Sequence, residues 1–372
     1  MVTAKKILLV QLYSNGDCLY ATAVARQIKS DFPGCLLTWA VSISCRNMLL
    51  GNPYVDETLI IDDVARDDVS AFRRLKRKFE EKIKEGVYDE LFITHIADTN
   101  LALYDGCIRS NILRAYPYPV TAPLTPVLRL SETEISSANA FAVTHQLEKY
   151  KHVILFEFAP QSGQSKITKE FALDVAEQIA KRGDAAVILS SGNSIDHPHP
   201  AVIDGSSLSI RETAALTHHC TLLLGCSSGI TWITTSDAAK QLPMVQLLNA
   251  QTKWVNPISR DFERFGSPVE TVIELVEFDA AKTLDCVNAA LQDFSSARMQ
   301  HNQPVPVHFK TTRNIIYNLL CYAEFSAISK HIRVNREVYG NNLSFYKEVV
   351  WGFVSFPFKL VRNLFMKKIV AK

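Results

Sequence analysis

Short runs of apolar residues alternate along this chain with segments whose apolar residues recur at helical spacing. The first run, 7–12, is nearly continuous, which is typical of a strand buried on both faces of a parallel sheet. Further strand-like runs span 35–41, 57–61, 90–94, 153–158, 186–190 and 222–224. Segments with helical character span 19–30, 69–85, 132–150, 169–182 and 210–218. Strands that alternate with helices in this way predict an α/β fold with parallel sheets.

Two of the strand-like runs end at a glycine-containing turn that leads into a helix-like segment. In the first half this unit covers 8–22, and in the second half it covers 222–230. Loops of this kind lie at the carboxyl end of a parallel sheet, where ligands bind. One such unit in each half predicts two α/β domains that face a common cleft, an arrangement that suits an enzyme with two substrates.

Changes in composition divide the chain into three parts. Four prolines mark a shift within 117–126, and the second α/β unit opens at His152. Beyond residue 310 the pattern changes again, with one helical stretch predicted over 311–329. We therefore predict an N-terminal Rossmann-like domain over 1–150, a C-terminal Rossmann-like domain over 151–310 and a helical, basic and aromatic tail over 311–372.

The end of the tail combines aromatic residues with cations. From residue 345 onward there are seven aromatic and six basic residues, and Glu348 is the one acid. Apolar burial and attraction to anionic lipid together hold interfacial segments on membranes. Peripheral membrane contact through 345–372 is therefore one expectation, and packing of the aromatic residues onto the N-terminal domain is the other. Pro357 is expected to interrupt any straight helix here.

The overall composition is that of a globular protein and narrows the chemistry. Of 372 residues, 47% are hydrophobic and 21% charged, and a net charge of +2 gives no general attraction to nucleic acid. Eight cysteines without C-x-x-C spacing indicate the reduced thiols of a cytosolic protein. The N-terminus enters a strand directly and no run of 18 apolar residues occurs, so we expect neither a secretory signal nor a conventional transmembrane helix. The expected location is cytoplasmic, at the inner face of the membrane if the tail docks there.

Metal and nicotinamide chemistry are not expected. His197, His199, His218 and His219 follow no zinc-binding spacing. An NAD-dependent oxidoreductase is disfavoured because no G-x-G-x-x-G follows the first strand of either half.

A set of short motifs occurs in a fixed order over residues 5–250. In the first half they are Gly16-Asp17 with Thr22, Phe32-Pro33 and Asn52-Pro53-Tyr54-Val55-Asp56. In the second half they are a polar loop at 160–166, Arg182-Gly183, Ser191-Gly192 and a helix at 208–216. This ordered set resembles glycosyltransferase family 9, the ADP-heptose:lipopolysaccharide heptosyltransferases and their relatives. The resemblance implies a GT-B fold of two Rossmann-like domains facing a cleft, with the acceptor bound by the first domain and the nucleotide sugar by the second. It also implies inverting, metal-independent transfer with no cofactor besides the nucleotide-sugar substrate.

The late glycine-rich loop departs from the family pattern. The family usually has Asp-Ser/Thr-Gly followed by a His, whereas this chain has Ser227-Ser228-Gly229, with Trp232 at the position of the His. The departure bears on the donor, ADP-heptose or another nucleotide sugar, more than on the fold. The alternative function is that of a non-catalytic or protein-assembly relative that has lost donor binding.

Asp17 is the candidate catalytic base. Transfer to a hydroxyl requires a base within hydrogen-bond reach of the acceptor proton, and the resemblance implies this role for an Asp at this position. The alternative is that Asp17 caps the helix, since Asp before a helix accepts backbone N–H bonds. We favour the base, acting on a glycan, lipid-linked or protein acceptor.

The donor diphosphate has candidate contacts in two loops. Lys166, with Ser165 beside it, supplies a cation against the charge of a leaving diphosphate, and the resemblance implies that contact; an exposed loop lysine is the alternative. The second loop offers hydroxyls and free N–H groups where a helix begins. Its candidate residues are Ser227, Ser228, Gly229 and Thr231. Glu157, inside an apolar strand, is expected to point into the cleft, since an unpaired buried carboxylate is costly.

Overall fold

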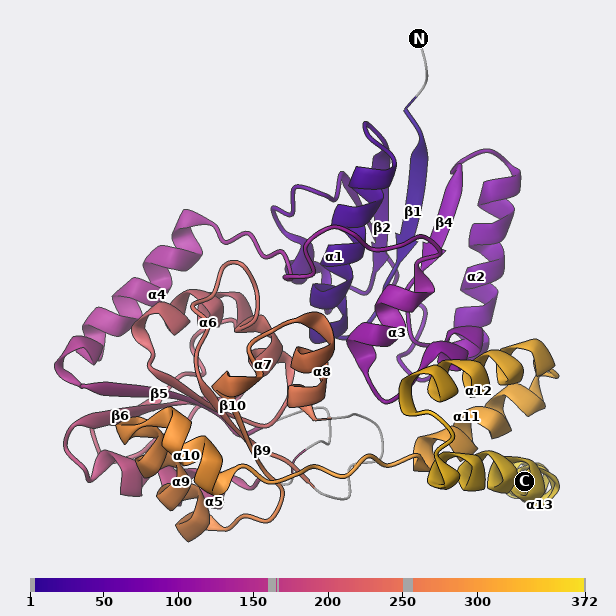
Figure 1. The fold of residues 1–372 in the computed structure, drawn as a ribbon. Coiled ribbons are helices and arrows are strands. Elements are labelled where there is room, and N and C mark those ends of the chain that lie inside the picture. Colours follow the sequence, from indigo (N-terminus) through magenta and orange to yellow (C-terminus); the bar gives the residue numbers. More distant parts are fainter. Residues whose placement is uncertain (1–3, 160–164, 166, 250–256, 371–372) are drawn as a thin grey trace.

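Two parallel sheets, one in each half of the chain, organise the structure (Figure 1). It is a computed structural model that describes residues 4–159, 165, 167–249 and 257–370, with side chains described as far as Val361. The first sheet has the order β3-β2-β1-β4 and consists of β1 (Lys6–Val10), β2 (Leu36–Val41), β3 (Glu57–Ile60) and β4 (Glu90–Ile93). The second has the order β10-β9-β8-β5-β6-β7 and consists of β5 (His152–Glu157), β6 (Ala185–Ser190), β7 (Val202–Asp204), β8 (Leu222–Gly225), β9 (Met244–Leu247) and β10 (Val272–Leu275). Every pairing between these strands is parallel, as predicted.

Helices cover both faces of the first sheet, which explains the unbroken apolar run of β1. Ile7 and Leu9 belong to the core that includes α1 (Asn15–Asp31). Leu8 and Val10 point to the other face, where Phe72 belongs to the same cluster. That face is covered by α2 (Val69–Lys84), whose remaining sides are solvated as its Arg, Lys and Glu content predicts. Since successive side chains of a strand alternate between faces, a strand covered on both sides needs apolar residues throughout.

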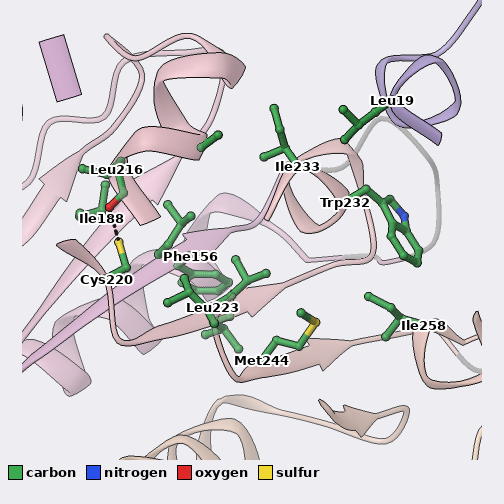
Figure 2. Close-up of a cluster of buried hydrophobic side chains, with 14 of the residues drawn as sticks. Leu19, Phe156, Ile188, Leu216, Cys220, Leu223, Trp232, Ile233, Met244 and Ile258 are labelled. Atoms are coloured by element: carbon green, nitrogen blue, oxygen red, sulfur yellow. Dashed lines mark hydrogen bonds between the residues drawn. The ribbon is translucent and has the colours of Figure 1, made fainter. Parts of the chain in front are cut away.

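The second sheet packs against helices of its own, one of which meets α1 of the first half. Its helices are α4 (Glu132–Thr144), α5 (Lys169–Ala180), α6 (Ile210–Leu216), α7 (Gly229–Ile233), α8 (Ile258–Phe265), α9 (Ala280–Gln292) and α10 (Phe294–His301). Figure 2 shows Phe156, Leu223 and Met244 from neighbouring strands packed together, with Leu19 of α1 approaching Ile233 of α7. One apolar cluster therefore extends from the first half into the second.

Local sequence signals set the ends of α4. It begins with a capping box, in which Ser131 accepts from the backbone N–H of Glu134 and the Glu134 carboxylate accepts from that of Ser131. It ends at Thr144, because Gln146 adopts a left-handed backbone with φ of 51° and a short 3-10 helix follows. The helix predicted over 132–150 is therefore interrupted near its end.

Three further helices return from the second half and pack on the first. They are α11 (Lys310–Cys321), α12 (Phe325–Tyr339) and α13 (Leu343–Val370). Ile315 and Ile328 pack against Ala102 and Tyr104, which lie in and after the short helix η2 (Asp98–Leu103). Figure 1 shows these helices beside α2 and α3 (Ile108–Ala115) and away from the second sheet.

Two predictions for this region were wrong. The single helix predicted over 311–329 is divided, because Ala323 has a left-handed backbone with φ of 57°. Pro357 lies inside α13 and does not end it. Proline removes the N–H that would bond to the carbonyl of Phe353, but Phe353 and Pro357 are both exposed, so water can bind that carbonyl.

Within the described part of the chain, no helix combines the length and the hydropathy needed to cross a membrane. All eight cysteines are free, seven of them buried and Cys321 exposed.

Candidate functional site

A cavity of about 580 Å³ lies between the two halves, where the carboxyl ends of their strands meet. The first half contributes Tyr13, Ser14, Asn15, Gly16, Asp17, Ser44, Cys45, Arg66 and Ile108. The second half contributes Glu157, Ala159, Ser190, Ser191, Gly192, Leu208, Ile210, Thr213, Ser227, Ser228, Gly229, Ile230 and Trp232. The two strand–turn–helix units predicted from the sequence thus line one cleft. A smaller cavity of about 200 Å³ adjoins it and shares Tyr13, Ser14, Asp17, Arg66 and Ile108 with it.

Asp17 lies in the first turn of α1, which begins four residues earlier than the sequence predicts. Ser14 is the N-cap of this helix, so Asp17 is not the cap residue itself. Its carboxylate accepts a hydrogen bond from the Ser14 backbone N–H, which fixes it over the start of the helix. Asp17 lines both the larger and the smaller cavity.

The surroundings of Asp17 adapt it to proton transfer near neutral pH. Burial raises the pKa of the Asp17 carboxyl to about 7, and the Arg66 guanidinium opposes this shift. Arg66 also donates a hydrogen bond to the Ser14 hydroxyl, which places its charge at the cavity wall. A carboxyl with a pKa near 7 can both take up and release a proton at physiological pH.

The opposite wall is the loop that joins β8 to α7. Gly225 at its start has no room for a side chain, since a Cβ there would lie 2.7 Å from Gln246 Nε2 and 2.8 Å from Thr231 Oγ1. Ser227 has a left-handed backbone with φ of 54°, and its N–H donates to Gln246 Oε1 at 2.8 Å. The Ser227 hydroxyl has no hydrogen-bond partner within the described residues.

Ser228 and Gly229 are the next two residues of this loop, and both line the cavity. Ser228 is the N-cap of α7, and its side chain makes no capping bond, so its hydroxyl is available to a ligand. Because α7 has only five residues, its dipole is small, and hydroxyl and loop N–H groups are the main donors here. Ser227, Ser228 and Gly229 line the same cavity as Asp17, and their contact with a donor stays a prediction.

Thr231 occupies a different place from the other candidate donor residues. It is fully buried, and its hydroxyl donates to Glu157 Oε2 at 3.1 Å. Thr231 therefore braces the loop from behind rather than lining the cavity. Glu157 ends β5 at the cavity wall, 3% exposed, and burial raises the pKa of its carboxyl to about 7 despite the hydrogen bond from Thr231.

The first candidate donor loop is only partly described. Lys166 lies outside the described residues. Ser165 is buried beside the Cys226 thiol and does not line the cavity.

Trp232 joins the two walls. Its ring lies 4.9 Å from that of Tyr20 in α1, edge to face, and a Cβ on Gly16 would lie 3.6 Å from Trp232 Cδ1. The large ring at this position therefore packs against the turn that carries Asp17, where a smaller residue would leave a gap. It is 8% exposed and has become part of the core between the halves.

Among the lining residues of the first half that sequence reasoning missed, Arg66 and Cys45 bear most on the chemistry of the cavity. Arg66 lies in the acidic loop after β3, and within the described residues it is the one cation of the cavity wall. A search for charged residues after each strand end would have found it, since those ends share one edge of the sheet. Cys45 precedes the short helix η1 (Arg46–Leu49), and a hydrogen bond from the Cys18 thiol is the main cause that lowers the pKa of the Cys45 thiol to about 6.

No cluster of three or more His, Cys, Asp or Glu side chains suited to a metal ion occurs among the described residues.

Solved structures show which known fold this chain has. No protein-family model matches it, and neither does any curated protein. The E. coli ADP-heptose LPS heptosyltransferase II is similar in structure with a TM-score of 0.52 and 15% identity, covering 77% of this chain and 98% of that one. A glycosyl transferase family 9 protein from Veillonella parvula has a TM-score of 0.50 and 14% identity, covering 79% of this chain and 94% of that one. At such identities the likeness is one of fold.

The class that fold and cavity define is the GT-B type, two α/β units with parallel sheets that face a shared cleft. The predicted fold class is thereby confirmed, and the resemblance to glycosyltransferase family 9 is confirmed at the level of the fold.

Proposed function

We propose that this protein is a glycosyltransferase that moves a sugar, heptose or a related one, from a nucleotide sugar to a hydroxyl acceptor. The observation that carries the proposal is the position of Asp17, which lines both the 580 Å³ cavity and the adjoining 200 Å³ cavity. A donor in the larger cavity and an acceptor hydroxyl in the smaller one would meet at this carboxylate. The GT-B fold supports the same conclusion, because it is shared with proteins named as glycosyl and heptosyl transferases.

The proposed reaction is a single displacement without a metal. The acceptor oxygen attacks the anomeric carbon as Asp17 takes its proton, and the bond from that carbon to the diphosphate oxygen breaks. Attack opposite the leaving group inverts the anomeric carbon. The nucleoside diphosphate leaves with the bonding electron pair, and its added charge requires donors and cations nearby.

The proposed groups for the leaving diphosphate come from both walls. Ser227, Ser228 and Gly229 line the cavity, the Ser228 hydroxyl makes no capping bond, and the buried Ser227 hydroxyl has no partner within the described residues. Arg66 supplies charge from the first half. We keep Lys166 and Ser165 as proposed contacts of the loop before α5, and Thr231 as the residue that positions the Ser227 loop through Glu157.

A thermal-shift screen with ADP, UDP, GDP and CMP sugars tests the function. When the free donor concentration is 100 times Kd, binding adds about 2.7 kcal/mol to the free energy of unfolding. A gain of this size raises Tm clearly. We expect the sugars of one nucleotide to raise Tm. When the acceptor is added, the matching nucleotide sugar should be consumed and the free nucleotide released. If none raised Tm at millimolar concentration, the non-catalytic or protein-assembly alternative would be favoured.

Replacing Lys166 by Ala is expected to weaken nucleotide binding by roughly tenfold, and more at low salt than at high salt, because salt screens a contact between charges. Calorimetry with the nucleoside diphosphate measures this directly. The matched control is Lys169→Ala, since Lys169 lies three residues away and is exposed at the start of α5. Equal affinity in Lys166→Ala and the wild type would remove Lys166 from the site.

We further propose that α13 holds the enzyme on an anionic membrane, where a lipid-linked acceptor would be within reach. One side of α13 packs on the body, with Phe345 fully buried and Gly352 against Ile316. The other side exposes large apolar residues. They include Val350 (59% exposed), Val354 (50%), Phe358 (75%) and Val361 (52%). Spacings of four, four and three residues place them in one stripe.

The charges near this stripe favour an anionic lipid surface over a protein partner of mixed charge. Lys347 lies on the same side of the helix as this stripe, and four more basic residues follow it beyond Val361. Lys359 faces the other way, toward Asn314 and Tyr317 of α11. Glu348, the one acid of this segment, already pairs with Arg313 at 2.6 Å. Phe345 packs against Phe309 and Val349 of the C-terminal segment itself and not onto the N-terminal domain, whereas Phe358 is exposed.

Replacing Val354 and Phe358 together by Ser is expected to reduce binding to vesicles of 30% phosphatidylglycerol by at least tenfold, with Tm nearly unchanged, because both side chains are exposed. Co-sedimentation at 150 mM salt measures binding, and pure phosphatidylcholine vesicles show the contribution of charge. The control is Val143→Ser with Met299→Ser, which removes apolar side chains exposed by 71% and 82% elsewhere. If the wild-type protein bound neither kind of vesicle, the proposal would be overturned.

A further inference from the structure

A second cavity of about 450 Å³ lies between the two halves, apart from the candidate active site. Its walls are the linker at 120–126, the start of α3, the residues after α7, and α8 with the turn that follows it. It has no described lining residue in common with the 580 Å³ cavity. Its volume is within the range of ordinary small-molecule sites. Nothing in the proposed transfer reaction uses it.

Arg109 is the one charged residue among the described residues that line this cavity. It is 4% exposed, so its guanidinium is almost wholly removed from bulk water. Its Nε has no hydrogen-bond partner within the described residues, and Asp261 Oδ2 lies 3.7 Å from it, too far for a hydrogen bond. The Asp261 carboxylate thus offsets the charge of Arg109 without bonding to its Nε–H, and a further acceptor would satisfy this buried donor.

Aromatic rings hold the Arg109 guanidinium in place. Its central carbon lies 4.5 Å from the ring centre of Tyr20, 5.3 Å from that of Phe265 and 5.7 Å from that of Trp232. Contacts with ring faces fix the orientation of the guanidinium without using its N–H donors. The charge is therefore positioned in advance of any ligand.

The rest of the cavity wall combines apolar side chains with hydroxyl and amide groups. The larger apolar side chains are Val120, Leu124, Leu242, Met244, Phe262 and Phe265, and the polar ones include Thr121, Thr234 and Gln241. Gln27 of α1 accepts from the backbone N–H groups of Thr121 and Ala122 at 2.8 and 2.7 Å, and Arg26 donates to the carbonyl of Pro123 at 2.7 Å. The linker wall is thereby fastened to the first half, so the cavity does not depend on a ligand to form it.

We propose that this cavity is a binding site for a small organic anion with an apolar body, such as an aromatic or short-chain carboxylate. The carboxylate accepts from Arg109, and the apolar body packs among Leu124, Phe262 and Phe265. A ligand bound there contacts the linker of the first half and α8 of the second, so it stabilises their association. The inference is independent of glycosyl transfer, because it uses a cavity and a charge that the proposed reaction leaves aside.

Two probes that differ mainly in charge test the proposal on the full chain: naphthalene-1-acetate and the neutral naphthalene-1-acetamide. By calorimetry the acetate is expected to bind at least tenfold more tightly than the acetamide and to raise Tm. Arg109→Met is expected to remove that preference. Arg109→Met also leaves Asp261 buried without its cation, which destabilises the fold. A second variant, Leu124→Trp, keeps Arg109 and fills the cavity from the half-buried linker wall, and it is expected to abolish binding of both probes.

Ile135→Trp, which adds the same ring at a position 43% exposed on α4, is the control and should bind both probes as the wild type does. The proposal is overturned if neither probe binds at millimolar concentration, if the two bind equally, or if Leu124→Trp binds them as the wild type does. None of these results bears on nucleotide-sugar binding, which the thermal-shift screen measures separately.

Discussion

Replacing Asp17 by Asn is expected to lower kcat by about a hundredfold or more, the usual effect of losing a general base, with donor affinity nearly unchanged. Asn has nearly the same shape as Asp and can still accept a hydrogen bond from the Ser14 N–H, so the start of α1 should be preserved. It cannot take the proton of the acceptor hydroxyl. Steady-state kinetics gives kcat, and calorimetry with the nucleoside diphosphate gives the affinity.

The pH dependence separates a base from a residue that merely shapes the cavity. A base with a pKa of about 7 is protonated and inactive below that pH, so kcat/KM of the wild type should fall tenfold for each pH unit below 7 and level off above it. In Asp17→Asn this acid limb should disappear. Asp63→Asn, an exposed carboxylate in the loop after β3, should leave both rate and profile unchanged.

Glu157 requires a separate variant, because burial also raises the pKa of its carboxyl to about 7. Glu157→Gln keeps an acceptor for the Thr231 hydroxyl and should therefore retain the Ser227 loop. If Asp17 is the base, this variant retains the acid limb. If instead kcat/KM no longer fell below pH 7 in Glu157→Gln but still fell in Asp17→Asn, Glu157 would be the catalytic base.

The sequence predicts those strands whose surroundings require apolar residues throughout. β1, β5 and β6 are covered on both faces and were found within one or two residues of their bounds. β9 and β10 were missed because each contains a buried polar residue that breaks the apolar run. These are Gln246, which accepts from Ser227, and Glu274, which accepts from the Ser259 hydroxyl at 2.6 Å. β7 has only three residues, too few to show any period.

The candidate site was predictable where it depends on local sequence and not where it depends on packing. A glycine-containing turn after an apolar run located Asp17 and Ser227–Gly229 at the correct edge of each sheet. Thr231 follows directly in sequence, yet the helical turn directs its hydroxyl away from the cavity toward Glu157. Arg66 and Cys45 reach the cavity from segments after β3 and β2, and their approach is fixed by contacts distant in sequence.

Replacing Arg211 by Met is expected to lower the free energy of unfolding by about 3 kcal/mol or more, because it leaves buried acceptors without their cation. Arg211 lies in the first turn of α6 and is 4% exposed. Its Nη2 lies 2.9 Å from a carboxylate oxygen of Glu134, and its Nη1 lies 2.9 Å from the carbonyl of Asn47 in the first half. It also donates to the carbonyl of Arg129. One side chain thus ties α6 to α4 and to the first half.

The same contact predicts how stability depends on pH. The hydrogen bond from Arg211 is the main cause that lowers the pKa of the Glu134 carboxyl to about 2, from an unfolded value near 4.5. A carboxyl with a lowered pKa in the folded state contributes stability above its unfolded pKa and loses it as the pH falls toward the folded one. The wild type should therefore lose stability between pH 4.5 and 2, and Arg211→Met should lose less over that interval.

Urea unfolding at pH 7, 5 and 3 measures both effects. Arg182→Met is the matched control, because Arg182 pairs with Asp184 at 3.0 Å on the surface of the second half. Removing an exposed pair of this kind should change the stability by less than about 1 kcal/mol. If Arg211→Met unfolded at the same urea concentration as Arg182→Met, the buried network would not be what holds α6 against the first half. If Arg211→Met were much less stable than the wild type at pH 7 and the difference were smaller at pH 3, the Arg211–Glu134 pair and its backbone acceptors would act as one unit.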